Sequence, residues 1–100
     1  MEIGRYYVDG EGFYKAVDKE EDCNNKSFVI MEAVMTNEHY VSYYAGIRFV
    51  ESACDRRMAE CTEEQFLKAK EKALKVIGEL YQYNSDVFFP AWEAKREQQL

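Results

Sequence analysis

The chain has 100 residues, of which 47% are hydrophobic and 32% are charged, and its net charge is −6. This length and composition predict one globular domain and exclude a disordered, collagenous or low-complexity chain. The chain offers no basic stripe to neutralise phosphates, so we expect no direct binding to nucleic acid and favour a basic partner instead. No apolar run approaches the ~20 residues of a membrane span, and the first residues lack the order of a signal peptide, so we expect a cytoplasmic protein that does not enter a membrane.

The first 61 residues carry the patterns of β-strands. Residues 5–8 and 11–17 predict two strands joined at Asp9-Gly10, because this dipeptide tolerates the positive φ of tight hairpin turns. Residues 18–26 are almost wholly polar and predict a solvated loop between this hairpin and the next strand.

Two further strand patterns follow this loop. Residues 27–35 form an apolar run that predicts a strand buried on both faces. Glu32 is the one charge in this run, and because an unpaired buried charge is costly, it must face an open edge or mark a bulge. Residues 39–50 alternate over a length that predicts a bend or bulge at Gly46. The expected apolar side of this strand comprises Val41, Tyr43, Ala45, Ile47 and Phe49.

The clearest local signal is the start of a helix. Residues 52–56 predict a turn and residues 57–61 a short fifth strand. Thr62 and Gln65 then have the spacing of a capping box, in which each side chain bonds the other residue's backbone N–H. A helix over residues 62–83 is predicted to cover the sheet. Its expected apolar stripe comprises Phe66, Leu67, Ala73, Leu74, Ile77, Leu80 and Tyr81.

The helix is expected to end near Tyr83, because the turn-forming residues 84–86 follow it. Pro90 suits a first helical position and predicts a short helix to residue 99. The predicted fold is therefore α+β, with a curved, partly closed antiparallel sheet of four or five strands followed by the long helix and the short one. A single domain spans residues 1–100, with a strand-rich part at 1–61, the main helix at 62–83 and an aromatic tail and short helix at 87–100. The order is similar to that of small SH3-like barrels, a similarity of pattern that implies no function.

No arrangement of chemically active residues predicts catalysis. Cys23, Cys54, Cys61 and His39 would supply a zinc-type donor set if the fold gathered them, but no C-x-x-C pair occurs. The odd cysteine count also argues against a disulfide framework. Cys61 precedes the helix start, a position that can activate a thiol, but a nucleophile would need His39 and a carboxylate beside it. We expect no metal, no cofactor and no enzyme activity.

The eight tyrosines point to recognition instead. Several lie in predicted strands, where only one side of each strand can face the helix, so some must face outward. Tyr40 and Tyr44 are the best candidates for an exposed binding face, because they lie opposite the apolar side of their strand. The acidic residues Glu20, Glu21 and Asp22 are candidates for a rim that attracts a basic partner.

The aromatic tail is the second candidate surface. Phe88, Phe89 and Trp92 lie within five residues and must be covered by something. The tail either folds back over the sheet as a lid or docks on a neighbouring copy, which would give a homodimer.

The leading functional hypothesis is a small, acidic, non-catalytic module that binds a protein partner through the tyrosine-bearing sheet face. One alternative is an inhibitor of the phage or mobile-element type that mimics nucleic acid, with carboxylates at residues 18–22, Glu32 and Glu38 forming one stripe. Another is a binder of a small ligand or nucleotide in a pocket at the junction of sheet and helix.

Overall fold

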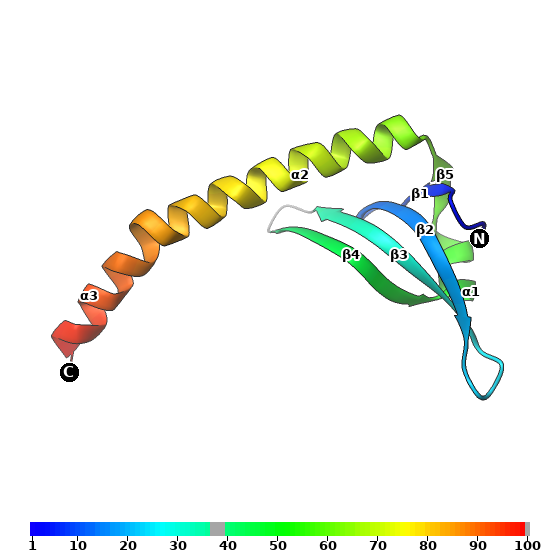
Figure 1. The fold of residues 1–100 in the computed structure, drawn as a ribbon, viewed down its shortest axis with the longest axis horizontal. Helices are drawn as coiled ribbons and strands as arrows, with labels where there is room; N and C mark the ends of the chain where they lie inside the picture. Colours follow the sequence, from blue (N-terminus) through cyan, green and yellow to red (C-terminus); the bar gives the residue numbers. More distant parts are fainter. Residues whose placement is uncertain (37–39, 100) are drawn as a thin grey trace.

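The structure is a computed structural model that describes residues 1–36 and 40–99. It consists of a five-stranded antiparallel sheet and a helical arm that extends away from it (Figure 1). The elements in chain order are β1 (Tyr6–Val8), β2 (Gly12–Glu21), β3 (Ser27–Thr36), β4 (Val41–Val50), α1 (Glu51–Arg57), β5 (Ala59–Cys61), α2 (Glu63–Tyr83), η1 (Asn84–Phe88) and α3 (Phe89–Gln99). The strand order is β4-β3-β2-β1-β5, so the predicted α+β class and the fifth strand are confirmed. The sheet stays open, with β4 and β5 as its two edges, so it is not an SH3-like barrel.

The β1–β2 turn lies at Asp9-Gly10, as predicted, but neither residue has the positive φ that this dipeptide tolerates. The turn is held by the Asp9 side chain instead. The Asp9 carboxylate accepts the backbone N–H groups of Glu11 at 2.8 Å and Gly12 at 3.0 Å, and it also accepts the buried Tyr14 hydroxyl at 3.1 Å. At Gly12 an added Cβ would lie 2.2 Å from the carbonyl oxygen of Val34. Glycine is therefore needed here because the backbone of β3 passes so closely.

The solvated loop predicted at residues 18–26 is only partly correct, because β2 continues to Glu21 and the turn is confined to residues 22–26. A register shift between Ala16 and Asp18 leaves Val17 as an extra residue, and pairing with β3 resumes beyond it. The polar residues after this bulge lie on an exposed stretch of the hairpin, where backbone pairing is sufficient to hold a strand.

A second bulge lies in β4, where the sequence placed it. Met31 pairs with Ile47 and Ala33 with Tyr44, so two residues of β4, one of them Gly46, lie opposite Glu32 alone. Glu32 thus marks a bulge, as predicted. Beyond the extra residue, side chains with the same odd or even numbering point to the opposite face of the sheet. The predicted single apolar side of this strand is therefore wrong. Ile47 and Phe49 belong to one core cluster, and Val41 and Tyr43 belong to the other.

The two clusters cover opposite faces of the sheet. On one face, α1 and the N-terminal segment cover a cluster of seven buried residues, which are Tyr7, Tyr14, Ala16, Val29, Met31, Ala33 and Cys54. On the other face, α2 contributes Phe66 and Ala73 beside Val34. The predicted turn at residues 52–56 is wrong, since α1 occupies this segment and buries Cys54.

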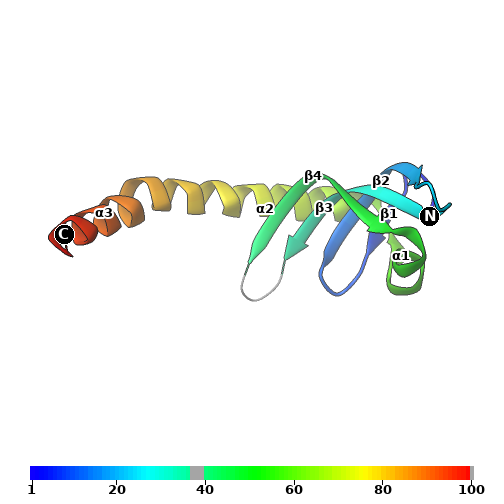
Figure 2. The ribbon, with the colours of Figure 1, turned by 90° about the horizontal axis from the view of Figure 1, so that it is seen from below.

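The prediction that the long helix ends near Tyr83 is wrong. Residues 84–88 form a π-helical turn, and α3 continues from it (Figures 1 and 2). Pro90 has no N–H to donate to the preceding turn. Because this turn is wider than an α-helical one, the helix continues through Pro90 without a break. The tail does not fold back over the sheet. We call residues 77–99 the arm.

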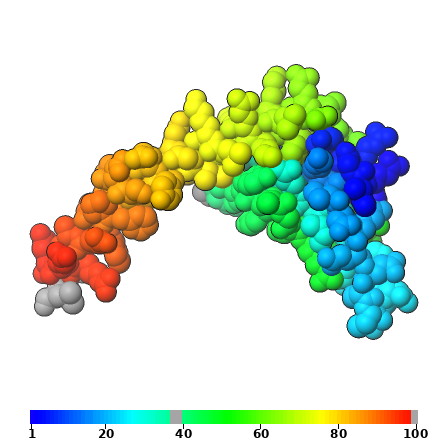
Figure 3. Space-filling view, viewed as in Figure 1, coloured from blue at the N-terminus to red at the C-terminus, as the bar shows by residue number. Residues whose placement is uncertain are grey.

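The arm makes the molecule elongated. The radius of gyration is 17.9 Å, and the principal extents are 55, 35 and 19 Å. A compact domain of this size has a radius of gyration of about 13 Å. In the space-filling view the arm extends beyond the sheet and curves toward the sheet side (Figure 3). In the described part of the chain, no helix has the length and apolar character needed to cross a membrane.

Candidate interaction surface

The start of α2 is fixed by the predicted capping box. The Thr62 hydroxyl accepts the N–H of Gln65 at 3.1 Å, and the Gln65 side chain accepts the N–H of Thr62 at 2.9 Å. One turn further on, the buried ring of Phe66 packs against Tyr6 at a centroid distance of 5.4 Å. These contacts hold the first half of α2 against the sheet.

A polar cluster between α2 and the sheet sets the orientation of the helix. Lys70 Nζ lies 2.6 Å from Glu32 Oε2, and the Tyr43 hydroxyl donates to the same oxygen. Burial disfavours the charged form of Glu32, but the hydrogen bonds from Lys70 and Tyr43 outweigh it and lower the pKa of the carboxyl. The hydrogen bond to Glu32 in turn raises the pKa of Lys70. The cluster ties β3, β4 and α2 together.

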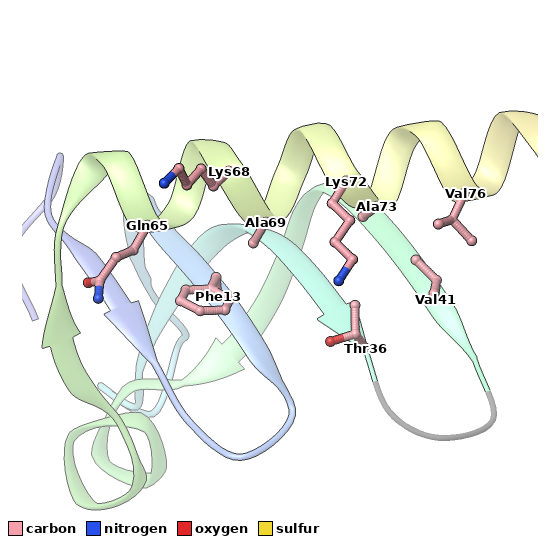
Figure 4. A pocket seen from close by; sticks show the side chains of 9 residues that line it. All are labelled: Phe13, Thr36, Val41, Gln65, Lys68, Ala69, Lys72, Ala73 and Val76. Atoms are coloured by element: carbon pink, nitrogen blue, oxygen red, sulfur yellow. The ribbon is translucent and has the colours of Figure 1, made fainter.

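Beside this cluster, a groove runs along one flank of α2. It has a volume of 560 Å³ and lies between the helix and the ends of β2, β3 and β4 (Figure 4). Its lining is mostly apolar, and two lysines lie on the helix above it. The lining residues are Phe13, Thr36, Val41, Gln65, Lys68, Ala69, Lys72, Ala73 and Val76.

The arm carries a dense set of uncovered apolar side chains. Their exposed fractions run from 48% for Phe88 to 72% for Tyr81, and the set comprises Leu80, Tyr81, Tyr83, Val87, Phe88, Phe89 and Trp92. The main packing partner of α3 is η1, and the arm lies beyond the end of the sheet (Figure 1). Soluble proteins rarely leave many large apolar side chains of one segment uncovered unless the segment binds something.

The predicted apolar stripe of the long helix is only partly correct. Phe66 and Ala73 are buried against the sheet, whereas Leu67 and Leu74 are exposed on the outer side. A pocket at the junction of sheet and helix was among the alternatives predicted from the sequence, but the residues that line it were not identified. The available signal was the spacing of Ala69, Ala73 and Val76, which marks a second apolar line beside the buried one.

The structure separates the two parts of the predicted sheet surface. Tyr44 is 43% exposed and pairs beside Ala33, at one end of β4. Glu20 pairs beside Phe28, five residues away along β3. Tyr40 precedes β4 and is likewise partly exposed. The tyrosines and the acidic residues therefore lie toward opposite ends of the sheet.

Two of the three acidic candidates already have partners in the chain. Glu20 lies 3.2 Å from Arg48 Nε, and Glu21 is exposed. The Asp22 carboxylate accepts the backbone N–H groups of Lys26 and Asn24, each at 2.9 Å. These hydrogen bonds, that from Lys26 first, lower the pKa of Asp22, which holds the β2–β3 turn.

The cysteines do not come together. Cys23 is exposed, Cys54 is buried and Cys61 lies between these extremes. Burial raises the pKa of Cys61, which opposes the activation that its place before the helix suggested. His39 and Glu38 lie outside the described residues. Within residues 1–36 and 40–99, no cluster of three or more His, Cys, Asp or Glu side chains could hold a metal ion.

Comparison with known proteins adds no identity to this description. No protein family, no curated protein and no solved structure matches the chain.

Proposed function

We propose that this chain is a non-catalytic protein-interaction module whose helical arm and adjoining groove form the binding surface. The observation that carries the proposal is the uncovered apolar set of the arm, from Leu80 to Trp92, on a helix that the sheet does not cover. Aromatic residues of this kind dominate the binding energy of protein interfaces. The sheet serves as a rigid base, held to the first half of α2 by Phe66 and the Glu32–Lys70 pair.

The geometry favours the arm over the two surfaces predicted on the sheet. Tyr44 and the acidic residues are too far apart to act as one patch with a rim, and Glu20 and Asp22 are engaged within the chain. Glu32 lies beneath α2 with 15% of its side chain exposed, so it supplies no part of the stripe that a mimic of nucleic acid would need.

A small-ligand function remains as a second candidate, because the groove provides a pocket at the junction of sheet and helix. Its apolar lining and the ammonium groups of Lys68 and Lys72 suit an amphipathic anion such as a fatty acid. A native mass spectrum of gently purified protein would reveal a retained ligand as a reproducible added mass.

Photocrosslinking tests the interaction function. A benzophenone amino acid at Phe89 is expected to give a protein adduct of defined mass, with this chain or with another protein. The same probe at exposed Lys26, on the β2–β3 turn, serves as the control. The Leu80→Asp variant should lose the adduct, because it places a charge in the apolar set. If the Phe89 probe yields no protein adduct that the Lys26 probe lacks, the proposal is wrong.

A further inference from the structure

The groove and the arm have complementary chemistry. The groove offers apolar walls from Ala69, Val76 and Val41, with the ammonium groups of Lys68 and Lys72 on the helix above them. A segment that fits it must be apolar and carry acidic groups along one flank. The arm has this composition, because Glu79 and Asp86 directly precede Leu80 and Val87.

The arm cannot fill the groove of its own chain. Residues 63–99 form one continuous helical rod whose first part lines the groove and whose arm extends beyond it (Figure 1). We propose that the occupant is a second copy of this chain, and that two chains pair with their α2 helices antiparallel so that each arm lies in the other's groove. This inference rests on the proposed function, since it names the partner of the arm.

The spacing of apolar residues supports this pairing. Groove and arm share one line of side chains with successive separations of four, three, four, three and four residues, as in a coiled coil. The line comprises Ala69, Ala73, Val76, Leu80, Tyr83 and Val87, the last of which lies in the π-helical turn. The side chains of this line are small at the groove end and larger toward the arm end. A side-by-side pair therefore packs well only if the two ends face each other.

The register follows from this size gradient. With a two-fold axis near residue 78, Ala69 lies opposite Val87 and Ala73 opposite Tyr83, while Val76 meets Leu80. Small residues then face large ones in each outer layer. Each of these contacts occurs twice, because a two-fold interface is self-complementary. The helices overlap over 19 residues, or about 28 Å at 1.5 Å per residue.

Charge selects the antiparallel direction. In this register Lys72 lies beside Asp86 of the partner copy, on the same flank of the helix pair, and the pairing occurs twice. In a parallel pair this flank would instead face the opposite flank of the partner helix, near Ile77 and Ala91, so neither ion pair would form. Glu79 lies near its own symmetry mate, and Lys75 one turn before it lies close enough to offset this repulsion.

The two sheets do not compete for space in this arrangement. Each sheet lies under the first half of its own α2, whereas the arm projects beyond it (Figures 1 and 3). The two-fold axis near residue 78 places the sheets at opposite ends of the helix pair. Each arm then rests in the groove beside the other chain's sheet.

Sedimentation equilibrium on charge variants tests the inference. The unmodified chain is expected to dimerise, and Lys72→Glu or Asp86→Lys alone should weaken dimerisation about 10- to 30-fold at low salt, since two ion pairs become two repulsions. The double variant K72E/D86K restores opposite charges and should return to within about threefold of the unmodified chain. Glu71→Lys, on the outer side of the same helix, should leave dimerisation unchanged. Circular dichroism verifies that each variant is helical.

An isotope-filtered NOE experiment tests the register. In a mixture of labelled and unlabelled chains, contacts between chains are expected from the methyl groups of Leu80, which is exposed, to those of Val76, which is half-buried. A dimer without rescue by the double variant, or with Tyr83 contacting Tyr83 of the other chain, would overturn the inference. A monomer whose Phe89 probe captures a different protein would refute the second copy but keep the interaction function. A monomer without any adduct would refute both.

Discussion

Loss of the Glu32–Lys70 pair gives a sharp test of how α2 is held. Glu32→Gln removes the charge that accepts from Lys70 Nζ at 2.6 Å and from the Tyr43 hydroxyl. A hydrogen bond to a charged group contributes about 1.5–3 kcal/mol. Lys70 is 31% exposed and can turn its ammonium group into water after the change, so we expect the lower end, about 1.5 kcal/mol. For a domain of this size, that loss lowers Tm by roughly 6–12 °C.

Urea denaturation followed by circular dichroism, at one fixed protein concentration, measures this loss. Because Glu32→Gln also affects Tyr43, a double-mutant cycle with Lys70→Met isolates the pair. We expect a coupling free energy of about 1 kcal/mol, which is the upper range for a partly exposed ion pair. A coupling below about 0.3 kcal/mol would show that the contact does not hold the helix, and the reasoning above would be wrong.

The stabilisation from the Glu32–Lys70 pair is expected to be lost at both low and high pH. The pKa of Glu32 is lowered by folding, so its contribution is present above the ordinary carboxyl pKa and is lost as pH falls through the folded value. The pKa of Lys70 is raised, so its contribution is present below the ordinary lysine pKa and is lost as pH rises through the folded value. The stability advantage of the unmodified chain over the E32Q/K70M variant should therefore be largest near neutral pH and shrink at both extremes.

Two further predictions concern the sheet and the thiols. Gly12→Ala should destabilise the chain by about 3 kcal/mol, the upper end of overpacking, because its Cβ would collide with the Val34 carbonyl, whereas Gly10→Ala meets nothing within 4 Å and should change little in the same urea assay. Iodoacetamide at pH 8 should modify exposed Cys23 first, Cys61 more slowly and buried Cys54 only on unfolding, since burial raises the pKa of both slower thiols. Peptide mass mapping follows the order, and faster modification of Cys61 than of Cys23 would contradict the structure.

The features predicted correctly from the sequence are those set by neighbouring residues. The Asp9-Gly10 turn, the bulge at Gly46 and the capping box of Thr62 and Gln65 each depend on a few adjacent side chains. The errors arise where contacts with distant parts of the chain determine the local structure. The bulge in β2 allows polar residues 18–21 to pair with β3, and the cover that α1 gives one sheet face turns residues 51–57 into a helix.

The end of the long helix shows a different limit. Residues 84–86 favour a turn by intrinsic preference, and Pro90 normally marks a helix start. A π-helical turn accommodates both within one rod, so local preference alone gave the wrong boundary. The sequence predicted that the aromatic tail needs a cover, but whether the tail lies on its own sheet could be decided only from the path of the helix.

The apolar side chains of α2 form two lines that sequence periodicity merges into one stripe. One line faces the sheet through Phe66 and Ala73, and the other runs from Ala69 through Val76 to Tyr83. Ala73 lies where the two lines meet, because it is buried against the sheet and also lines the groove. At 100° per residue the two lines lie only about 60° apart, so a helical wheel shows a single broad apolar face. The sheet ends beneath the first half of α2. Only the position of this end shows which side chains the sheet covers and which it leaves exposed. Beyond the end of the sheet, the apolar side chains of the helix need a second surface to cover them. The order of charges from Lys72 to Asp86 suits a copy of the chain itself as that surface.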